Sequence, residues 1–548
     1  MAINNTRKWS AFVVLCAALA TASIFFTSCN ADSQTQRDNT VVTESPTSQP
    51  AATTRETTNA SGPVGDKELA LAVDSLIDTN EFAAARWGIS VIKVKDGRTL
   101  YERNADKLFT PASNMKLFPT GVALELLGPD YHWRTSVYAA TQPDAGGTLN
   151  GDLILYGRGA PDLVAQTRKE GGGSLAQLAA DLYNHGLRRV TGNVIGDESY
   201  FRGDPVGDGW QWNDMQWYFG AEASALTVNN NEVGINVFPP EKSGETPLAK
   251  VTDLSGYVTV MNEMKTVDSS EKLTLGIHRG LSDNTVTIWG TFPSGSKGFG
   301  ARLSVHQPSL WAARLFLEAL KSHGITIEGG AQSRDSRQPP SERFDPSKAT
   351  ELAFTSSKSL GEIAKQTNKE SINLYAELIL RTLGRERGTL ISANETGGRE
   401  RGDDEVGLGI IRLWLSRAGV SMAGMALHDG SGLSRLDLIS PRAFTSLMKE
   451  LSQRGSASVF RDSLPLAGRD GTLGGRLVTL ADRVSAKTGS LTYDNALTGY
   501  VNAANGEVLA FSIICNDEIV RHTSTQAIDQ IVSVLAAYPG PFKEIATK

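Results

Sequence analysis

The chain has few of the residues on which disulfide frameworks and metal centres depend. Among its 548 residues are 3 cysteines and 7 histidines. Cys16 lies inside a hydrophobic N-terminal segment and Cys29 at its end, which leaves Cys515 without a partner. A disulfide framework and a cysteine-rich zinc site are therefore excluded. The histidines form no H-x-x-x-H or H-x-H pair, which argues against a zinc hydrolase, and we expect neither metal nor cofactor.

A strong excess of one charge is also lacking. The chain has 54 basic and 60 acidic residues, so its formal net charge is only -6. This small charge gives no reason to expect nucleic acid or an anionic membrane surface as a partner. Hydrophobic residues at 40% and charged residues at 21% are typical of a soluble globular protein. The length is too great for one hydrophobic core and predicts two or three domains.

One long hydrophobic run is present, and it lies near the N-terminus. Two basic residues precede the apolar residues 11–26, and small residues follow, ending in Cys29. This order is that of a secretory signal. A small pair followed by cysteine resembles the bacterial lipobox, although Phe26 stands where leucine is usual. In this interpretation residues 1–29 are a lipoprotein signal peptide and Cys29 becomes a lipid anchor in a membrane. An ordinary cleaved signal and an uncleaved anchor are the alternatives.

Residues 30–65 differ in composition from everything that follows. They are rich in Ser, Thr, Gln, Asn and Pro and contain almost no large apolar side chain. Such a segment cannot bury enough apolar surface to offset the entropy of ordering. We therefore expect a disordered linker between the signal and the folded part.

The spacing of apolar residues divides the rest of the chain into three parts. Residues 66–130 predict a helix, a hairpin turning at Asp96-Gly97, and a second helix over 117–127. Residues 131–349 are mostly short β-like runs separated by glycine and proline. Helices resume at Ser359, and strands with a closing helix end the chain. The order predicts one discontinuous domain, residues 66–130 with 350–548, split by one or two β-rich domains over 131–349.

A hydroxyl and an amine lie three positions apart at the start of the predicted helix. Ser113 and Lys116 would share a face there, since positions i and i+3 do so on a helix. Near a helix N-terminus the backbone N–H groups are free and the dipole is positive. A partly desolvated lysine can act as a base toward a serine nucleophile. The pattern S-x-x-K is common by chance, so the interpretation depends on partners elsewhere.

Two segments supply such partners. Ser371-x-Asn373 stands just before a predicted helix, and Lys487-Thr488-Gly489 lies on a predicted strand that a hairpin follows. Alone, the first is more often a helix surface and the second a turn. Together with Ser113-x-x-Lys116, in this order and in these elements, they resemble the catalytic triplet of the penicilloyl serine transferases.

Further segments narrow the resemblance to one family. They are Asp429-Gly430-Ser431-Gly432-Leu433-Ser434-Arg435, Leu464-Pro465-Leu466-Ala467-Gly468, Asp470-Gly471 and Val484-Ser485-Ala486-Lys487-Thr488-Gly489-Ser490-Leu491. These look like the D-Ala-D-Ala carboxypeptidase/endopeptidase family of class C low-molecular-mass penicillin-binding proteins. Gly209-Trp210-x-Trp212-Asn213-Asp214-Met215 is similar to its inserted region. The long interval between S-x-x-K and S-x-N also fits this family, and class A β-lactamases have a far shorter one.

Two positions depart from the family pattern. Ile372 stands where most members have aspartate, and Gly157-Arg158-Gly159-Ala160-Pro161 replaces a G-G-D-P-like turn. The resemblance nevertheless implies the fold class. It is an α+β, three-layer transpeptidase domain of the penicillin-binding and β-lactamase type, with an antiparallel sheet flanked by helices and split by a long, mostly β insertion.

The resemblance also implies a role for each motif residue. Ser113 would attack the carbonyl of the penultimate D-alanine, and Lys116 would take its proton as general base. Ser371 would relay a proton to the departing D-alanine. Asn373 would bind the substrate amide and help hold Lys116. Lys487 would place positive charge near the terminal carboxylate of the substrate.

Four further positions follow from the same resemblance. Thr488 would bind the carboxylate through its hydroxyl, and Gly489 would let the substrate strand approach the backbone. The N–H groups of Ser113 and Ser490 would form the oxyanion hole. Asp214 would meet the ammonium group of a diamino acid in the peptide; a local turn cap is the alternative interpretation.

The resemblance predicts a serine-type D-Ala-D-Ala carboxypeptidase, a DD-endopeptidase, or both. Peptidoglycan stem peptides would be substrates, and β-lactam antibiotics covalent inhibitors. The expected location is the bacterial cell envelope on the periplasmic side. Two other classes stay open: a β-lactamase or esterase of the same fold, and a catalytically silent envelope lipoprotein that binds peptidoglycan.

Two kinds of side chain are expected to be structural. Trp210, Trp212 and Trp217 are interpreted as packing residues rather than a ligand platform. Cys515 lies in an apolar run and is expected to be a buried small hydrophobic residue.

Overall fold

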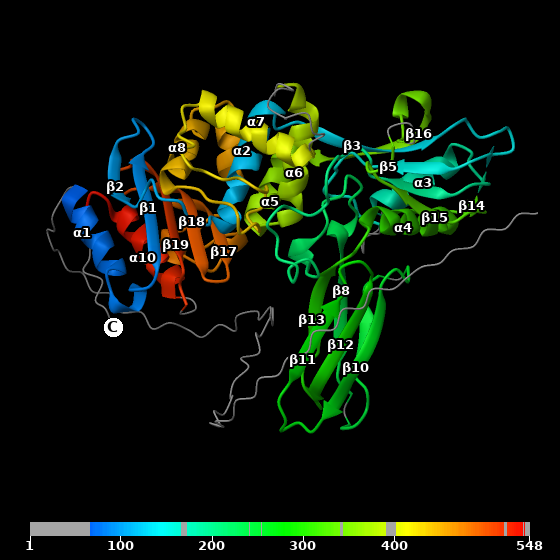
Figure 1. Ribbon diagram of the computed structural model, residues 1–548, viewed down its shortest axis with the longest axis horizontal. Coiled ribbons are helices and arrows are strands. Elements are labelled where there is room, and N and C mark those ends of the chain that lie inside the picture. Colours follow the sequence, from blue (N-terminus) through cyan, green and yellow to red (C-terminus); the bar gives the residue numbers. More distant parts are fainter. Residues whose placement is uncertain are drawn as a thin grey trace, which may run out of the picture. The chain divides into compact units, whose positions relative to one another are not determined.

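The structure is a computed structural model, and it describes residues 66–165, 173–240, 242–253, 255–339, 343–390, 402–519, 523–540 and 542 (Figure 1). All of these belong to one of the two units into which the chain divides, residues 56–548. The predicted signal peptide with Cys29 and the predicted linker lie outside the described residues. Within the described part, no helix combines the length and apolar character that crossing a bilayer requires.

The first sheet joins the two ends of the described chain. It has five antiparallel strands in the order β17-β18-β19-β1-β2. Its strands are β1 (Arg86–Lys93), β2 (Thr99–Arg103), β17 (Val484–Leu491), β18 (Asp494–Asn502) and β19 (Val508–Asn516). Ile89 pairs with Ile513, so the N-terminal hairpin is completed by the last strand of the chain.

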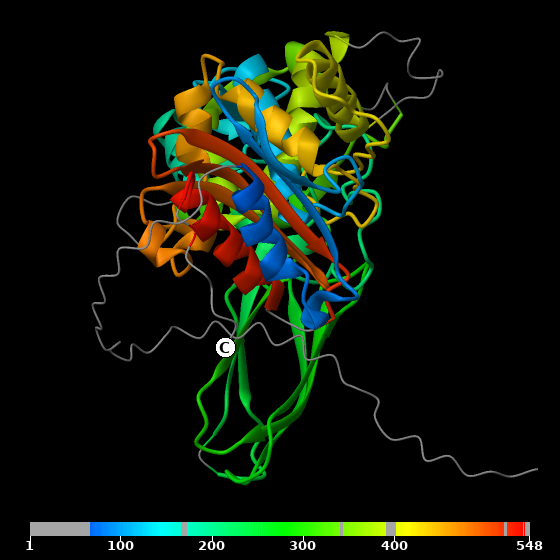
Figure 2. The same ribbon diagram turned by 90° about the vertical axis from the view of Figure 1, so that its left-hand side faces the viewer.

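Two separate hydrophobic cores lie on the two faces of this sheet. Helices α1 (Asp66–Ile77) and α10 (Thr523–Ala537) cover one face, as the blue and red helices of Figure 2 show. Ile513 belongs to the core under these helices, and its neighbour Ile514 belongs to the core on the other face. This alternation is what the two-residue period of a strand requires.

The second core is built around a wholly apolar helix. In α2 (Leu117–Leu126), residues 117–124 are all buried, as expected for a helix that is hydrophobic on every side. The helices of this region are α5 (Leu360–Glu370), α6 (Asn373–Arg387), α7 (Asp403–Arg417), α8 (Pro441–Leu451) and α9 (Ala457–Ser463). Side chains from all of them join this core.

The inserted region carries a second five-stranded sheet, in the order β15-β7-β5-β3-β16. Its strands are β3 (His132–Ala139), β5 (Leu153–Tyr156), β7 (Val194–Asp197), β15 (Ala331–Arg334) and β16 (Thr350–Ser359). Beside it are α3 (Ser174–Asn184), α4 (Pro308–Ser322) and the short strands β4 (Thr148–Leu149), β6 (Arg189–Val190) and β14 (Thr326–Ile327). Because β16 pairs with β3, the structure places the return from the insertion at Leu360 rather than near residue 350.

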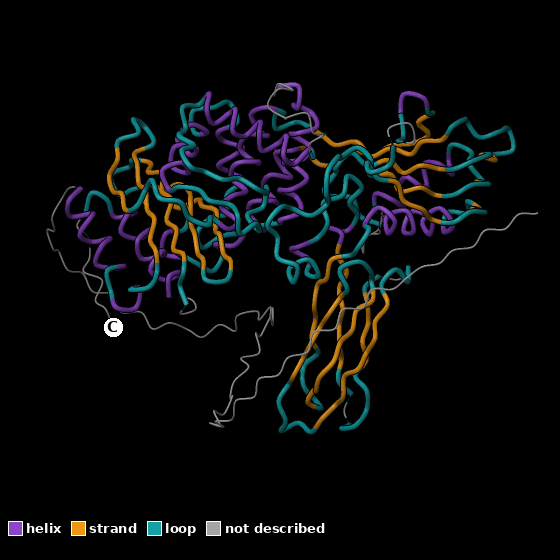
Figure 3. Tube along the Cα trace, viewed as in Figure 1, coloured by secondary structure: helices purple, strands orange, loops and turns teal. Residues whose placement is uncertain are grey.

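Two three-stranded sheets complete the insertion and share their own core. One contains β8 (Glu232–Phe238), β9 (Leu248–Val251) and β13 (Phe299–Ser304), and the other β10 (Thr259–Val267), β11 (Thr274–Arg279) and β12 (Thr285–Pro293). Figure 3 shows this part as strands and loops, in contrast to the helical region around α6.

Candidate active site

Ser113 and Lys116 lie on a tight turn that precedes α2. The turn is a 3-10 helix, η2 (Ala112–Lys116), and not the first turn of an α-helix. Residues three apart eclipse one another in a 3-10 helix, since it has three residues per turn. Lys116 Nζ accordingly lies 2.9 Å from Ser113 Oγ. Ser113 is half-buried, whereas Lys116 is fully buried.

Lys116 has two further partners, and both can only accept hydrogen bonds. Its Nζ lies 2.6 Å from Asn373 Oδ1 and 2.6 Å from the carbonyl oxygen of Ser431. A neutral amine has two hydrogens and one lone pair. Because the two acceptors take the two hydrogens, the lone pair of a neutral Lys116 faces the hydroxyl of Ser113. The geometry therefore directs the basic electron pair of the amine at the proton of the nucleophile.

Burial makes the neutral form of Lys116 accessible near neutral pH. It lowers the pKa of Lys116 to about 7, although the carboxylates of Asp429, Glu377 and Asp437 act in the opposite direction. Taking an ammonium ion out of water is costly and favours release of its proton. Lys116 thus fits a general base, whose best pKa lies near the working pH.

Ser371 lies at the junction of α5 and α6 and faces the second lysine. It ends α5 in a left-handed conformation, with φ 58° and ψ 41°. Lys487 Nζ, on β17, donates to Ser371 Oγ at 2.9 Å and to the carbonyl of Thr488 at 2.8 Å. Burial, with repulsion from Lys116, lowers the pKa of Lys487 well below its usual value. Each of the two lysines therefore contacts one of the two serines.

The K-T-G strand passes closely over the turn that carries Ser113. A Cβ atom at Gly489 would lie 2.6 Å from the carbonyl oxygen of Pro111, so only glycine fits without movement. The close approach at Gly489 is thus to the enzyme's own turn. Thr488 Oγ1 donates to Thr472 Oγ1 at 2.7 Å, and the side chain of Ser490 is exposed.

The inserted region contributes a segment to this site. Asn373 Nδ2 donates to the carbonyl of Phe219, at 2.8 Å, in the 3-10 helix η3 (Tyr218–Gly220). Trp210 Nε1 donates to Asp429 Oδ2 at 2.9 Å. Asp214 lies between these two contacts in the chain and is half-buried. Burial raises the pKa of Asp214, the nearby charge of Arg435 opposes this, and no described side chain hydrogen-bonds to its carboxylate.

The structural residues divide into confirmed and corrected predictions. Cys515 is fully buried, and burial raises the pKa of its thiol to about 12, so the predicted inert residue is confirmed. Trp217 packs against the core of the three-stranded sheets. Trp212 is 67% exposed, so the packing prediction is wrong for this residue.

Sequence reasoning missed two groups in the site. The carbonyl of Ser431 accepts from Lys116, and the hydroxyl of Thr472 accepts from Thr488. Both lie in or beside segments that carry the family resemblance, Asp429 to Arg435 and Asp470-Gly471. The residue types gave no signal, because a backbone carbonyl belongs to every residue and a hydroxyl in a loop is common.

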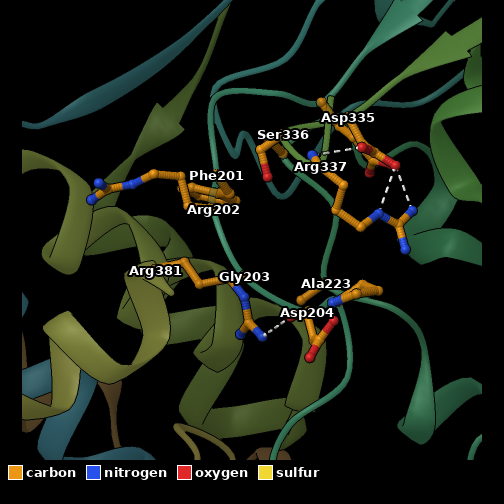
Figure 4. A pocket seen from close by; sticks show the side chains of 12 residues that line it. Phe201, Arg202, Gly203, Asp204, Ala223, Asp335, Ser336, Arg337 and Arg381 are labelled. Carbon is orange, nitrogen blue, oxygen red and sulfur yellow. Dashed lines mark hydrogen bonds and ion pairs between the residues drawn. The ribbon is translucent and has the colours of Figure 1, made fainter. Parts of the chain in front are cut away.

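A polar pocket lies apart from these residues, between the insertion and α6 (Figure 4). Its arginines are paired with acids. Arg202 lies 2.8 Å from Asp403, Arg381 lies 2.7 Å from Glu377, and Arg337 pairs with Asp335. None of the predicted site residues lines it. Paired charges of this kind favour a structural role, and the chemistry is assigned to the Ser113 site.

Two known proteins are similar in sequence to most of this chain. A D-alanyl-D-alanine carboxypeptidase of Actinomadura sp. (strain R39) is 32% identical over 486 residues, which cover 86% of this chain and 85% of that protein. The D-alanyl-D-alanine carboxypeptidase DacB of Haemophilus influenzae is 26% identical over 433 residues, covering 77% of this chain and 84% of that protein.

A solved structure shows the same fold. The crystal structure of penicillin binding protein 4 (dacB) from Haemophilus influenzae matches with a TM-score of 0.71 and 24% identity, over 85% of this chain and 99% of that one. The fold class expected from the motifs is confirmed. The family model for the D-Ala-D-Ala carboxypeptidase 3 (S13) family matches residues 69–538. The chain therefore belongs to the D-Ala-D-Ala carboxypeptidase 3 (S13) family.

Proposed function

We propose that the protein is a serine DD-peptidase that cleaves D-Ala-D-Ala ends or cross-links of peptidoglycan stem peptides through an acyl-enzyme on Ser113. The observation that supports this most directly is the lone pair of Lys116, which its other two partners direct at the Ser113 hydroxyl. β-Lactam antibiotics acylate the same serine in this proposal. They are covalent inhibitors because the enzyme releases them slowly.

Acylation begins with proton transfer from Ser113 to Lys116. Ser113 Oγ then attacks the carbonyl carbon of the penultimate D-alanine, and negative charge develops on the carbonyl oxygen. The backbone N–H groups of Ser113 and Ser490 stabilise this charge as an oxyanion hole. β17 is an edge strand of its sheet, and its first residues pair with the segment around Leu466. The substrate adds as a further strand along the remainder of β17.

The second lysine and its neighbours act on the leaving D-alanine. Ser371 donates a proton to the departing nitrogen and regains one through the lysines. The carboxylate of the leaving residue lies near Lys487 and accepts from the Thr488 hydroxyl. A bound carboxylate raises the pKa of Lys487, because opposite charge favours the ammonium form. Substrate binding thus opposes the effect of burial on the pKa of Lys487.

Asp214 gives the proposed site its preference for a diamino acid. Its carboxylate is half-buried and has no hydrogen-bond partner among the described residues, so an incoming ammonium group would find a free anion. An Asp214→Asn variant should lose about tenfold to hundredfold in kcat/KM toward a diaminopimelate-bearing peptide, the worth of one charged hydrogen bond. Release of D-alanine is the measurement.

Bare diacyl-D-Ala-D-Ala is the matched control substrate for Asp214→Asn, and its turnover should stay at the wild-type value. An equal loss on both peptides would remove Asp214 from the substrate contacts. Failure of the wild-type enzyme to release D-alanine from either peptide would contradict the proposed function itself.

We propose further that Cys29 is lipidated and anchors the enzyme in the cell envelope, on the periplasmic side. The support is the apolar run 11–26 that ends in small residues and cysteine. Cells expressing the full chain should incorporate radiolabelled palmitate into it, and Cys29→Ala should lose the label. A secreted, unlabelled wild-type protein would instead indicate an ordinary cleaved signal.

A further inference from the structure

One buried carboxylate organises the loop behind Lys116. Asp429 is 1% exposed, and its carboxylate accepts several hydrogen bonds. The donors are the backbone N–H groups of Gly432 at 2.7 Å, Leu433 at 3.0 Å and Ser434 at 3.0 Å, the Ser431 hydroxyl at 2.8 Å, and Trp210 Nε1 at 2.9 Å. An acid with this many donors is held as a carboxylate.

The loop that Asp429 holds contacts Lys116 and passes close to the residue before Ser113. The carbonyl of Ser431 accepts from Lys116 Nζ at 2.6 Å. Gly432 has φ +78°, and a Cβ there would lie 1.9 Å from the carbonyl oxygen of Ala112, next to Ser113. The position of the loop therefore decides where the hydrogens of the Lys116 amine point.

A second acid, Asp437, lies against Asp429. It is fully buried, and its Oδ1 accepts from the backbone N–H of His428 at 2.7 Å. Its Oδ2 is buried and has no donor among the described residues, while its carboxyl group hydrogen-bonds with that of Asp429. Two carboxylates can only accept, so such a contact needs a proton on one of them.

The surroundings place this proton on Asp437. Burial and the charge of Asp429 raise the pKa of Asp437 well above its usual value. Burial also opposes ionisation of Asp429, but hydrogen bonds from Asp437, Gly432 and Ser431 outweigh it and lower its pKa. Two carboxylates in contact inside a protein do not both ionise readily.

The other charged groups near Lys116 are Glu377, which has partners of its own, and Lys487. Glu377 accepts from the backbone N–H of Gly430 at 2.8 Å and lies 2.7 Å from Arg381. Burial and the charge of Asp429 raise the pKa of Glu377 to about 7, and Arg381 opposes this. Lys487 is the neighbouring cation. Among the acids near Lys116, Asp429 raises the pKa of this lysine most, ahead of Glu377 and Asp437.

We propose that Asp437 carries a proton that it shares with Asp429, and that this acid pair, with a single negative charge, is the positioning element that sets the lone pair of Lys116 on Ser113. This inference deepens the proposed function and rests on it. A pair with two negative charges would hold Lys116 as an ammonium ion, which has no lone pair to accept the Ser113 proton.

The test compares Asp437→Asn with the double variant Asp429→Asn/Asp437→Asn. The measurement is the rate constant of acylation by a fluorescent penicillin as a function of pH. Asp437→Asn keeps a donor toward Asp429 and the single negative charge, so the midpoint of the acidic limb should stay at its wild-type pH. The double variant removes the charge that favours the ammonium form, so its midpoint should move to lower pH. Its plateau rate should fall about tenfold or more because the loop loses its carboxylate.

An infrared measurement tests the proton without relying on activity. At about pH 9, above the pKa of about 7 of Glu377 and Glu198, the wild-type protein should show the stretching band of a buried protonated carboxyl group, and Asp437→Asn should lose it. A midpoint that already moves in Asp437→Asn, or the absence of that band in the wild type, would overturn the proposal. So would a double variant with unchanged midpoint and plateau. Failure of the wild type to label at all would instead contradict the proposed function.

Discussion

A Ser113→Ala variant should form no covalent adduct with a fluorescent penicillin and should lose about 10⁴-fold or more in D-alanine release from a diacyl-D-Ala-D-Ala peptide. The reason is that Ser113 Oγ forms the ester bond in both reactions. Lys116 would remain in place with its other two partners, Asn373 and Ser431, so the variant should keep its fold. Gel fluorescence after denaturation measures the adduct.

The matched control for Ser113→Ala is Ser75→Ala, on the exposed face of α1. The hydroxyl of Ser75 donates only to the carbonyl of Ala72, 2.9 Å away within the same helix. This variant should label as the wild type does. Labelling that survives in Ser113→Ala would place the nucleophile elsewhere. A wild-type adduct that hydrolyses rapidly would favour the alternative of a β-lactamase.

The second large effect is expected at the general base. Lys116→Ala should lower the acylation rate constant by about 10²- to 10⁴-fold, the usual contribution of a positioned base. In the wild type the rate should fall as the pH drops through about 7, because burial lowers the pKa of Lys116 to about 7 and only the neutral amine accepts the Ser113 proton. The measurement is acylation from about pH 5 to about pH 9.

The same pKa fixes the sign of a stability effect. The pKa of Lys116 falls from 10.5 to about 7 on folding, so the folded protein loses stability as the pH falls through this interval, because folding must remove a proton that the unfolded chain holds; the loss is complete below the folded value. The control for Lys116→Ala is Lys321→Ala, on the exposed side of α4. It should leave the acylation rate constant and its pH dependence unchanged. A wild-type rate that stays level on the acidic side would exclude Lys116 as the base.

Local sequence determined much of the site, because its parts depend on short-range spacing. The spacing of three positions between Ser113 and Lys116 brings a hydroxyl and an amine together in any tight helical turn. The need for glycine at position 489 arises instead from a distant segment, the turn at Pro111. The fold class followed from the family resemblance that the motifs carry, and the fold of a solved structure confirms it.

What the sequence could not predict depends on contacts between distant segments. Asp437 is two positions beyond a noticed motif, yet its proton depends on how the chain folds Asp429 back against it. The Ser431 carbonyl is selected by tertiary position alone. The strand β16 was missed because its side chains alternate weakly between buried and exposed, and its pairing with β3 lies far away in the sequence.

The first sheet can form only late in the synthesis of the chain, because it joins strands from both ends. β1 has β19 as a neighbour, and the ion pair beside that contact joins Arg86 to Asp517, 431 positions later. A ribosome or export channel delivers the N-terminal hairpin long before its partner strand exists. Until the C-terminal strands emerge, β1 presents an open edge that other chains could pair with. Ser113 is thus synthesised early, but the active site around it is complete only when almost the whole chain has been made.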